Sequence, residues 1–157
     1  MKLFQIEEPG GTPAEFDGPG AAVGIDIAPG IGGAVAVAVA GNAELLPGRD
    51  GERRLAVPFD TPDGGVDAAA LAELLLGLRE RAEKQLARPV THAVIAAALP
   101  LDATLIDAAA HRAGLAVLRH MDRAAAAALA GKQPADDAAA LGAALQAEDD
   151  AVALGGR

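Results

Sequence analysis

Short apolar runs and longer amphipathic segments alternate along this chain from Ala21 onward. Runs rich in Val, Ile and Ala that are bounded by Gly, Pro or Asn predict strands, and apolar residues recurring every three or four positions predict helices. We expect strands at about 22–27, 34–40, 53–59, 91–97 and 115–119, with a weak extension or short strand at 43–46. We expect helices at about 67–87, 102–113 and 122–130, and a last helix opened by Pro134.

The order of these elements is β-β-β-α-β-α-β-α-α, which is typical of the ribonuclease-H-like fold. The same unit is one half of the actin-like fold. Right-handed crossovers place the last two strands beside the first. The sequence therefore predicts an α/β domain that corresponds to a single actin-like lobe, with a mixed five-stranded sheet of order 3-2-1-4-5 and helices on both faces.

The first 20 residues have the composition of a loop or tail, with several prolines and glycines. Leu3, Phe4 and Ile6 are compatible with either a short added edge strand or disorder. We expect residues 1–20 to form a flexible N-terminal segment and residues 21–157 to form one domain.

Composition restricts the classes of function. The net charge of −9 leaves no basic stripe for nucleic acid or an acidic membrane. The chain has no cysteine, so disulfides and thiolate metal sites are excluded. It has neither a signal-peptide pattern nor an apolar run long enough to span a membrane. We expect a soluble, cytoplasmic protein.

A lone carboxylate, Asp26, ends the first strand and is followed by a Gly-rich turn. A buried charge is costly unless it is solvated, paired or bound to a cation. Glycines allow the backbone to approach an anion such as phosphate. The segment is therefore either a Mg²⁺–phosphate corner formed by Asp26, Ala28, Gly30, Gly32 and Gly33, or only a tight hairpin.

Several segments in order along the chain resemble DnaK-type heat-shock chaperones of the actin-like ATPase superfamily. Residues 22–39 are similar to the first phosphate loop of that family, whose strand ends in Asp before Gly-Thr-Thr. Residues 122–131 are similar to its Asn-Glu-Pro-Thr-Ala-Ala-Ala-Leu-Ala segment. Further similarities cover 41–59, 81–95, 113–119 and, for the connecting helix, 136–147. The resemblance implies that Asp26 coordinates Mg²⁺ through water and that Mg-ATP or Mg-ADP binds beside it.

The chain also departs from that family. Ala28-Pro29-Gly30 replaces Gly-Thr-Thr, and Arg123 stands where the family has Glu. The second phosphate loop, the adenosine loop, the second lobe and the substrate-binding domain have no counterpart. We therefore expect at most weak Mg-nucleotide binding and an inefficient ATPase. We expect the domain to self-associate as a homodimer, or to bind a protein partner, which would supply the missing lobe.

Two other functions stay open at this stage. The first is a non-catalytic protein-interaction or regulatory module without a ligand. The second is a ribonuclease-H- or RuvC-like nuclease, which needs several carboxylates around two metal ions. Its candidates are Asp26, Glu73 and either Asp136 or Asp137, but the strand 91–97 ends in alanines where such enzymes commonly have an acid.

Two remaining patterns carry less information. His92, His111 and His120 fall on separate elements without metal-ligand spacing, so we expect surface or hydrogen-bonded histidines. The segment 136–142 recurs at 149–155, which is either a local duplication or a coincidence of alanine-rich sequence.

Overall fold

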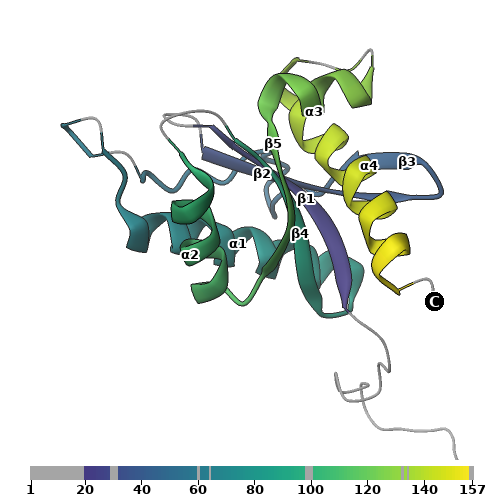
Figure 1. The fold of residues 1–157 in the computed structure, drawn as a ribbon, viewed down its shortest axis with the longest axis horizontal. Helices are drawn as coiled ribbons and strands as arrows, with labels where there is room; N and C mark the ends of the chain where they lie inside the picture. The colour runs from purple at the N-terminus through teal and green to yellow at the C-terminus, as the bar shows by residue number, and fades with distance from the viewer. Residues whose placement is uncertain are drawn as a thin grey trace, which may run out of the picture.

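The computed structural model describes residues 20–28, 32–59, 61–63, 65–97, 101–131, 133 and 135–155, without the side chains of 135, 136, 154 and 155. The predicted N-terminal segment before Gly20 lies outside these residues. In the described part, one five-stranded sheet has the order β3-β2-β1-β4-β5 (Figure 1). Its strands are β1 (Ala21–Ala28), β2 (Gly32–Val39), β3 (Asn42–Leu45), β4 (Val90–Ala97) and β5 (Ala116–Asp122).

The sheet is mixed, as the sequence predicts. β1 pairs antiparallel with β2, and β2 pairs antiparallel with β3. β1 pairs parallel with β4, and β4 pairs parallel with β5. The predicted strand order is therefore confirmed.

The identity of the third strand is corrected. The third strand is Asn42–Leu45, whereas the segment 53–59 contributes only an isolated bridge between Leu55 and Gly33. β3 pairs with Ala36–Val39 in the later part of β2, and Leu55 pairs beside the start of β2. The chain thus leaves the sheet edge after Leu46 and returns to it at Leu55. Pro58 cannot donate to a ladder, so it does not prolong the pairing.

Helices α1 (Ala68–Leu86) and α2 (Ala103–Arg112) cover one face of the sheet, and α3 (Arg123–Ala130) and α4 (Ala135–Gly155) cover the other (Figure 1). The first three follow the predicted boundaries closely. Each of them begins after an aspartate whose side chain accepts hydrogen bonds from backbone N–H groups of the first turn, namely Asp67, Asp102 and Asp122.

Large aliphatic side chains build the core between the sheet and α1. Val23, Ile25 and Ile27 alternate along β1 and point to this face. They meet the apolar stripe that helical spacing predicts for α1, of which Leu71, Leu74, Leu75, Leu78 and Ala82 are buried and Leu86 is partly buried. This layer contains most of the large buried side chains, so it dominates the hydrophobic stabilisation.

The opposite face packs through small residues instead. α4 lies so close to β1 that a Cβ atom on Gly24 would fall 2.1 Å from the backbone nitrogen of Ala144. α3 lies equally close to α4, because a Cβ atom on Gly142 would fall 1.6 Å from the carbonyl oxygen of Ala126. The alanine-rich composition therefore allows backbone-to-backbone packing on this side of the sheet.

Both copies of the internal repeat fall on α4. A spacing of 13 residues turns an α-helix by roughly 220° beyond whole turns, so equivalent positions face different directions. Asp137 is buried against the body, whereas the equivalent Asp150 pairs with Arg119 of β5. Among the described helices, none combines the length and the apolar character that a membrane crossing requires.

Candidate functional site

Asp26 lies near the C-terminal end of the central strand β1, between Ala34 of β2 and Ala96 of β4. Its neighbours Ile25 and Ile27 point toward α1, so the side chain of Asp26 points to the face covered by α3 and α4. The residue is fully buried. A carboxylate in this position requires compensating charge and hydrogen bonds.

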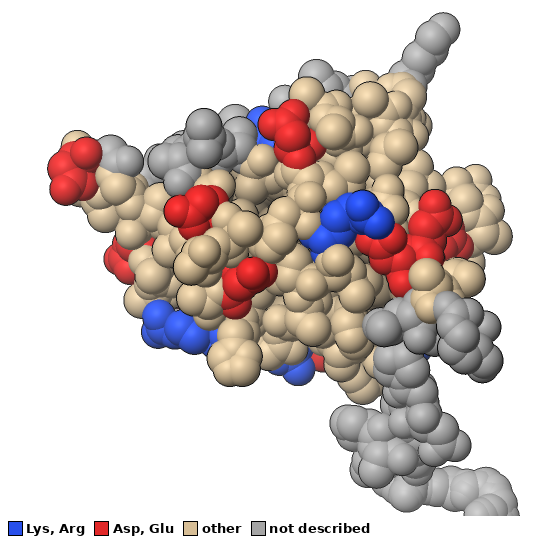
Figure 2. Space-filling view, viewed as in Figure 1, with Lys and Arg blue, Asp and Glu red and all other residues tan. Residues whose placement is uncertain are grey.

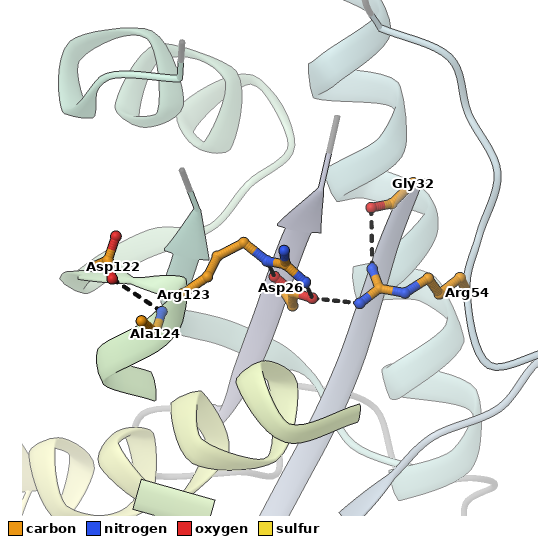
Figure 3. Close-up of polar contacts among 6 residues, drawn as sticks. All are labelled: Asp26, Gly32, Arg54, Asp122, Arg123 and Ala124. Carbon is orange, nitrogen blue, oxygen red and sulfur yellow. Dashed lines mark hydrogen bonds and ion pairs between the residues drawn. The ribbon is translucent and has the colours of Figure 1, made fainter. Parts of the chain in front are cut away.

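Arg123 supplies one part of that compensation (Figure 3). Its Nε donates to Oδ1 of Asp26 at 2.6 Å, and its Nη2 donates to Oδ2 at 2.9 Å. Arg123 is the first residue of α3, directly after Asp122, whose carboxylate accepts a hydrogen bond from the backbone nitrogen of Ala124 at 3.0 Å. The helix start thus holds the guanidinium in the two-pronged geometry that suits a carboxylate.

Arg54 approaches the same carboxylate from the other side (Figure 3). Its Nη2 donates to Oδ2 of Asp26, and its Nη1 donates to the carbonyl oxygen of Gly32 at 3.3 Å. The neighbouring Leu55 fixes this segment by two backbone hydrogen bonds with Gly33, of 3.1 Å and 2.8 Å. Two arginines from segments far apart in the sequence therefore meet on Asp26.

Packing accounts for the two glycines of the predicted phosphate loop that the structure describes. Gly32 has φ +106°, and a Cβ atom there would lie 2.3 Å from the carbonyl oxygen of Leu55. A Cβ atom on Gly33 would lie 2.7 Å from a methyl carbon of Leu78. Gly32 thus needs glycine whether or not a ligand binds, whereas a side chain at Gly33 would require the Leu78 side chain to shift.

Of the two remaining members of that predicted loop, the structure describes Ala28 but not Gly30. Ala28 is the buried last residue of β1 and pairs with Gly32. Gly30 lies outside the described residues, as does Pro29. The assignment of a nucleotide or Mg²⁺ ligand to this set stays a prediction, and the structure adds that both oxygens of Asp26 accept hydrogen bonds from arginines.

The carboxylates considered for a nuclease do not gather around Asp26. Glu73 is exposed on α1, which covers the opposite face of the sheet. Asp137 is mostly buried on α4, with its Oδ2 3.8 Å from Nη1 of Arg53, and the side chain of Asp136 lies outside the described part. Within the residues described, no three His, Cys, Asp or Glu side chains are grouped so that they could hold a metal ion.

The three histidines lie apart from this region. Nε2 of His120 is 2.8 Å from a carboxylate oxygen of Asp107, and Nδ1 of His92 is 2.7 Å from the hydroxyl of Thr91. His111 is exposed in the last turn of α2. The expectation of surface or hydrogen-bonded histidines is confirmed.

Surface charge gives no sign of a polyanion site on the face seen in Figure 2, where several acidic side chains gather at the right edge and the others are scattered among uncharged ones. The basic side chains among the described residues on that face are few and do not gather into a patch. A groove that follows a nucleic-acid backbone would need such a patch.

Sequence reasoning identified Asp26 and noted the reversed charge at Arg123, but it did not connect them, and it missed Arg54. The signal for Arg54 was weak, because an arginine in a polar–apolar alternating segment usually faces solvent. Only the return of the chain to β2 at Leu55 brings it to the carboxylate.

Comparison with known proteins does not assign a family. No protein-family model matches the chain, and no curated protein has significant sequence similarity to it. The contacts of Asp26 are therefore the main basis for a functional proposal.

Proposed function

We propose that this domain is a non-catalytic protein-interaction or regulatory module built on a single actin-like lobe. The main observation in support of this proposal is that Arg123 donates hydrogen bonds to both carboxylate oxygens of Asp26. Arg54 adds a further contact to Oδ2 of the same carboxylate.

The positive charge beside Asp26 comes from arginine side chains. A buried carboxylate that binds Mg²⁺ is stabilised by the metal, directly or through its water shell. Here two guanidinium groups provide the positive charge and the hydrogen bonds. A metal or its water would have to displace an arginine, which would leave that partly buried guanidinium with weaker compensation.

The contact between Arg123 and Asp26 joins two positions that the resemblance to DnaK-type chaperones singles out. In that family the position of Arg123 carries Glu, and the position of Asp26 carries the Asp that binds Mg²⁺ through water. If Asp26 and Arg123 were far apart, the retained aspartate and the replacement of Glu by Arg would be unrelated. Their direct contact supports the proposal that an arginine has replaced the cation.

The backbone groups of Gly32 and Gly33 that a phosphate loop would offer to a ligand take part in hydrogen bonds within the chain. The N–H of Gly33 donates to the carbonyl oxygen of Leu55 at 3.1 Å, and its own carbonyl oxygen accepts from Leu55. The hairpin also uses Gly32 to accept from Arg54. These described glycines therefore serve the pairing of chain segments, which supports a structural role for the turn.

Isothermal titration with Mg-ATP and Mg-ADP tests this proposal against weak nucleotide binding. We expect no saturable heat at millimolar nucleotide for the native chain, and the same result for Asp26→Asn and for the exposed control Asp149→Ala. Saturable heat that disappears in Asp26→Asn but persists in Asp149→Ala would overturn the proposal.

Light scattering after size-exclusion chromatography adds a second readout. If a second copy supplied the missing lobe around a nucleotide, Mg-ATP would raise the molar mass. The proposal predicts the same mass with and without Mg-ATP, and a nucleotide-dependent dimer would contradict it.

A further inference from the structure

An apolar groove of about 500 Å³ lies at the end of the sheet where β1 begins. Its walls are the start of β1, the end of β2 and the C-terminal part of α4, which Figure 1 places at the same end of the molecule. Most of its lining is glycine, alanine and larger aliphatic residues, with Val39 and Val152 on its walls and Gly20 beside the start of β1. Asp26 lies toward the other end of β1, so this groove is separate from the arginine contacts.

The groove contains exposed apolar side chains. Val39 and Val152 line it and are 67% and 65% exposed, which makes them the most exposed large hydrophobic side chains among the described residues. Val39 and Val152 are therefore the exposed apolar side chains that a segment bound in the groove would cover.

The chain itself offers an occupant. Gly20, where the N-terminal segment joins the body, is one of the lining residues. The 19 residues before it lie outside the described part, but their sequence contains the apolar run Leu3-Phe4-Gln5-Ile6. Positions 7–19 connect this run to Gly20 and can span up to about 40 Å when extended, which is ample for a return to a groove beside Gly20.

The segment and the groove each carry charges of both signs. Lys2 precedes the apolar run, and Glu7 and Glu8 follow it. The groove carries one residue of each sign, Arg88 and Glu148. The Glu148 carboxylate is held in place because it accepts hydrogen bonds from the backbone nitrogens of Ala40 and Gly41.

We propose that Leu3–Ile6 of the same chain binds this groove and covers Val39 and Val152. Covalent connection favours this occupant over a free peptide or a second copy, because a short tether gives the segment an effective concentration in the millimolar range. The groove is then a binding surface that the chain occupies by itself, and any partner that uses it must displace the N-terminal segment.

Disulfide trapping tests this directly, since the natural chain contains no cysteine. The test variant is Gln5→Cys with Val152→Cys, which leaves Leu3, Phe4 and Ile6 in place. The matched control is Gln5→Cys with Leu129→Cys, because Leu129 is 48% exposed on α3, the helix that begins beside Asp26. Both replacements are at exposed body positions, and a thermal melt of each reduced variant confirms that it folds.

At micromolar protein and under mild oxidation, we expect an intramolecular disulfide between positions 5 and 152 to form at least about tenfold faster than the control disulfide. Adding Leu3→Asp and Ile6→Asp to the test variant should remove that advantage. Equal rates in the two pairs, or no disulfide in the test pair, would overturn the proposal. A concentration-dependent intermolecular disulfide would also overturn it, in favour of a second copy in the groove.

Discussion

Arg123 and Asp26 are 97 positions apart in the sequence, yet the Nε and Nη2 groups of the arginine donate to the two oxygens of the same carboxylate. This contact ties the start of α3 to the centre of the sheet. It also gives the buried Asp26 a compensating positive charge, so the structural and functional roles of the pair can be tested together.

Replacing Arg123 by alanine should destabilise the domain strongly. The change removes two charge-assisted hydrogen bonds and leaves Asp26 buried with less compensation. Since Arg54 still contacts the carboxylate, we expect a loss of about 2–4 kcal/mol in the free energy of unfolding. Urea denaturation followed by circular dichroism measures this value.

The control for that experiment is Arg119→Ala. Arg119 also forms a two-pronged pair, with Asp150 at 2.9 and 3.1 Å, but its side chain is half exposed. Exposed ion pairs contribute about 0–1 kcal/mol. If Arg123→Ala and Arg119→Ala lowered the free energy of unfolding by similar amounts, the burial of Asp26 would not be the source of the stabilisation.

The interaction between Asp26 and Arg123 should make a large favourable contribution to the free energy of unfolding. Asp26→Asn removes the charge and places an amide donor group against guanidinium donors, so we expect it to cost about 3–5 kcal/mol. Once Asn is present, Arg123→Gln should cost much less than it does in the native chain. A double-mutant cycle measures this difference, and additive effects would contradict the pairing.

The fold was largely predictable because its signals are local. Helical spacing of leucines from Leu71 to Leu86 and capping aspartates such as Asp67 and Asp102 define helices within a few neighbouring residues. The third strand was misplaced because Arg53–Phe59 alternates polar and apolar residues as a strand does. In the structure, the short segment Asn42–Leu45 pairs with the edge of β2 instead, because a tight turn at Ala40 and Gly41 folds the chain back. That competition depends on tertiary pairing and is not visible in local composition.

The site was predictable only in part. Asp26 was recognisable as a charge at the end of an apolar strand. Its partners depend on contacts over 28 and 97 positions, and spacing along the chain carries no information about such contacts. The glycines were open to either a ligand or a packing explanation, and only the positions of Leu55 and Leu78 show the packing requirement.

Gly142→Ala should destabilise the domain even though alanine is the better helix former. Its Cβ atom would overlap the carbonyl oxygen of Ala126, which is backbone and cannot rotate away. We expect a loss of about 1–3 kcal/mol. The control is Gly77→Ala on α1, where the new Cβ meets only a methyl carbon of the Leu55 side chain. We expect this change to be close to neutral, because the gain of about 0.5–1 kcal/mol from the higher helix propensity of alanine offsets the cost of moving that side chain.

Thermal melts of these two glycine variants provide the measurement. Equal melting temperatures would contradict the close backbone packing of α3 on α4, as would a larger loss in Gly77→Ala than in Gly142→Ala.

The ion pair between Arg119 and Asp150 should add a small amount to the free energy of unfolding, and this amount should disappear at acidic pH. The hydrogen bond from Arg119 holds the pKa of Asp150 below its usual value of 3.8. Because the unfolded state therefore takes up the proton first as the pH falls, this contribution is complete above pH 3.8 and is lost as the pH falls through the folded-state pKa. The free energy of unfolding of native chain and Asp150→Asn should differ by about 0–1 kcal/mol at neutral pH and converge in acid. A difference that grows in acid would contradict the pairing.

The central claim is that arginines occupy the carboxylate of Asp26 in place of a metal-bound nucleotide. Nuclear magnetic resonance of the arginine Nε–H groups tests it most directly, with Arg123→Lys used to assign the signal of Arg123. The account predicts a slowly exchanging Nε–H signal for Arg123 that neither moves nor broadens in millimolar Mg-ATP. A rapidly exchanging signal, or one that shifts in a saturable way with Mg-ATP, would contradict it.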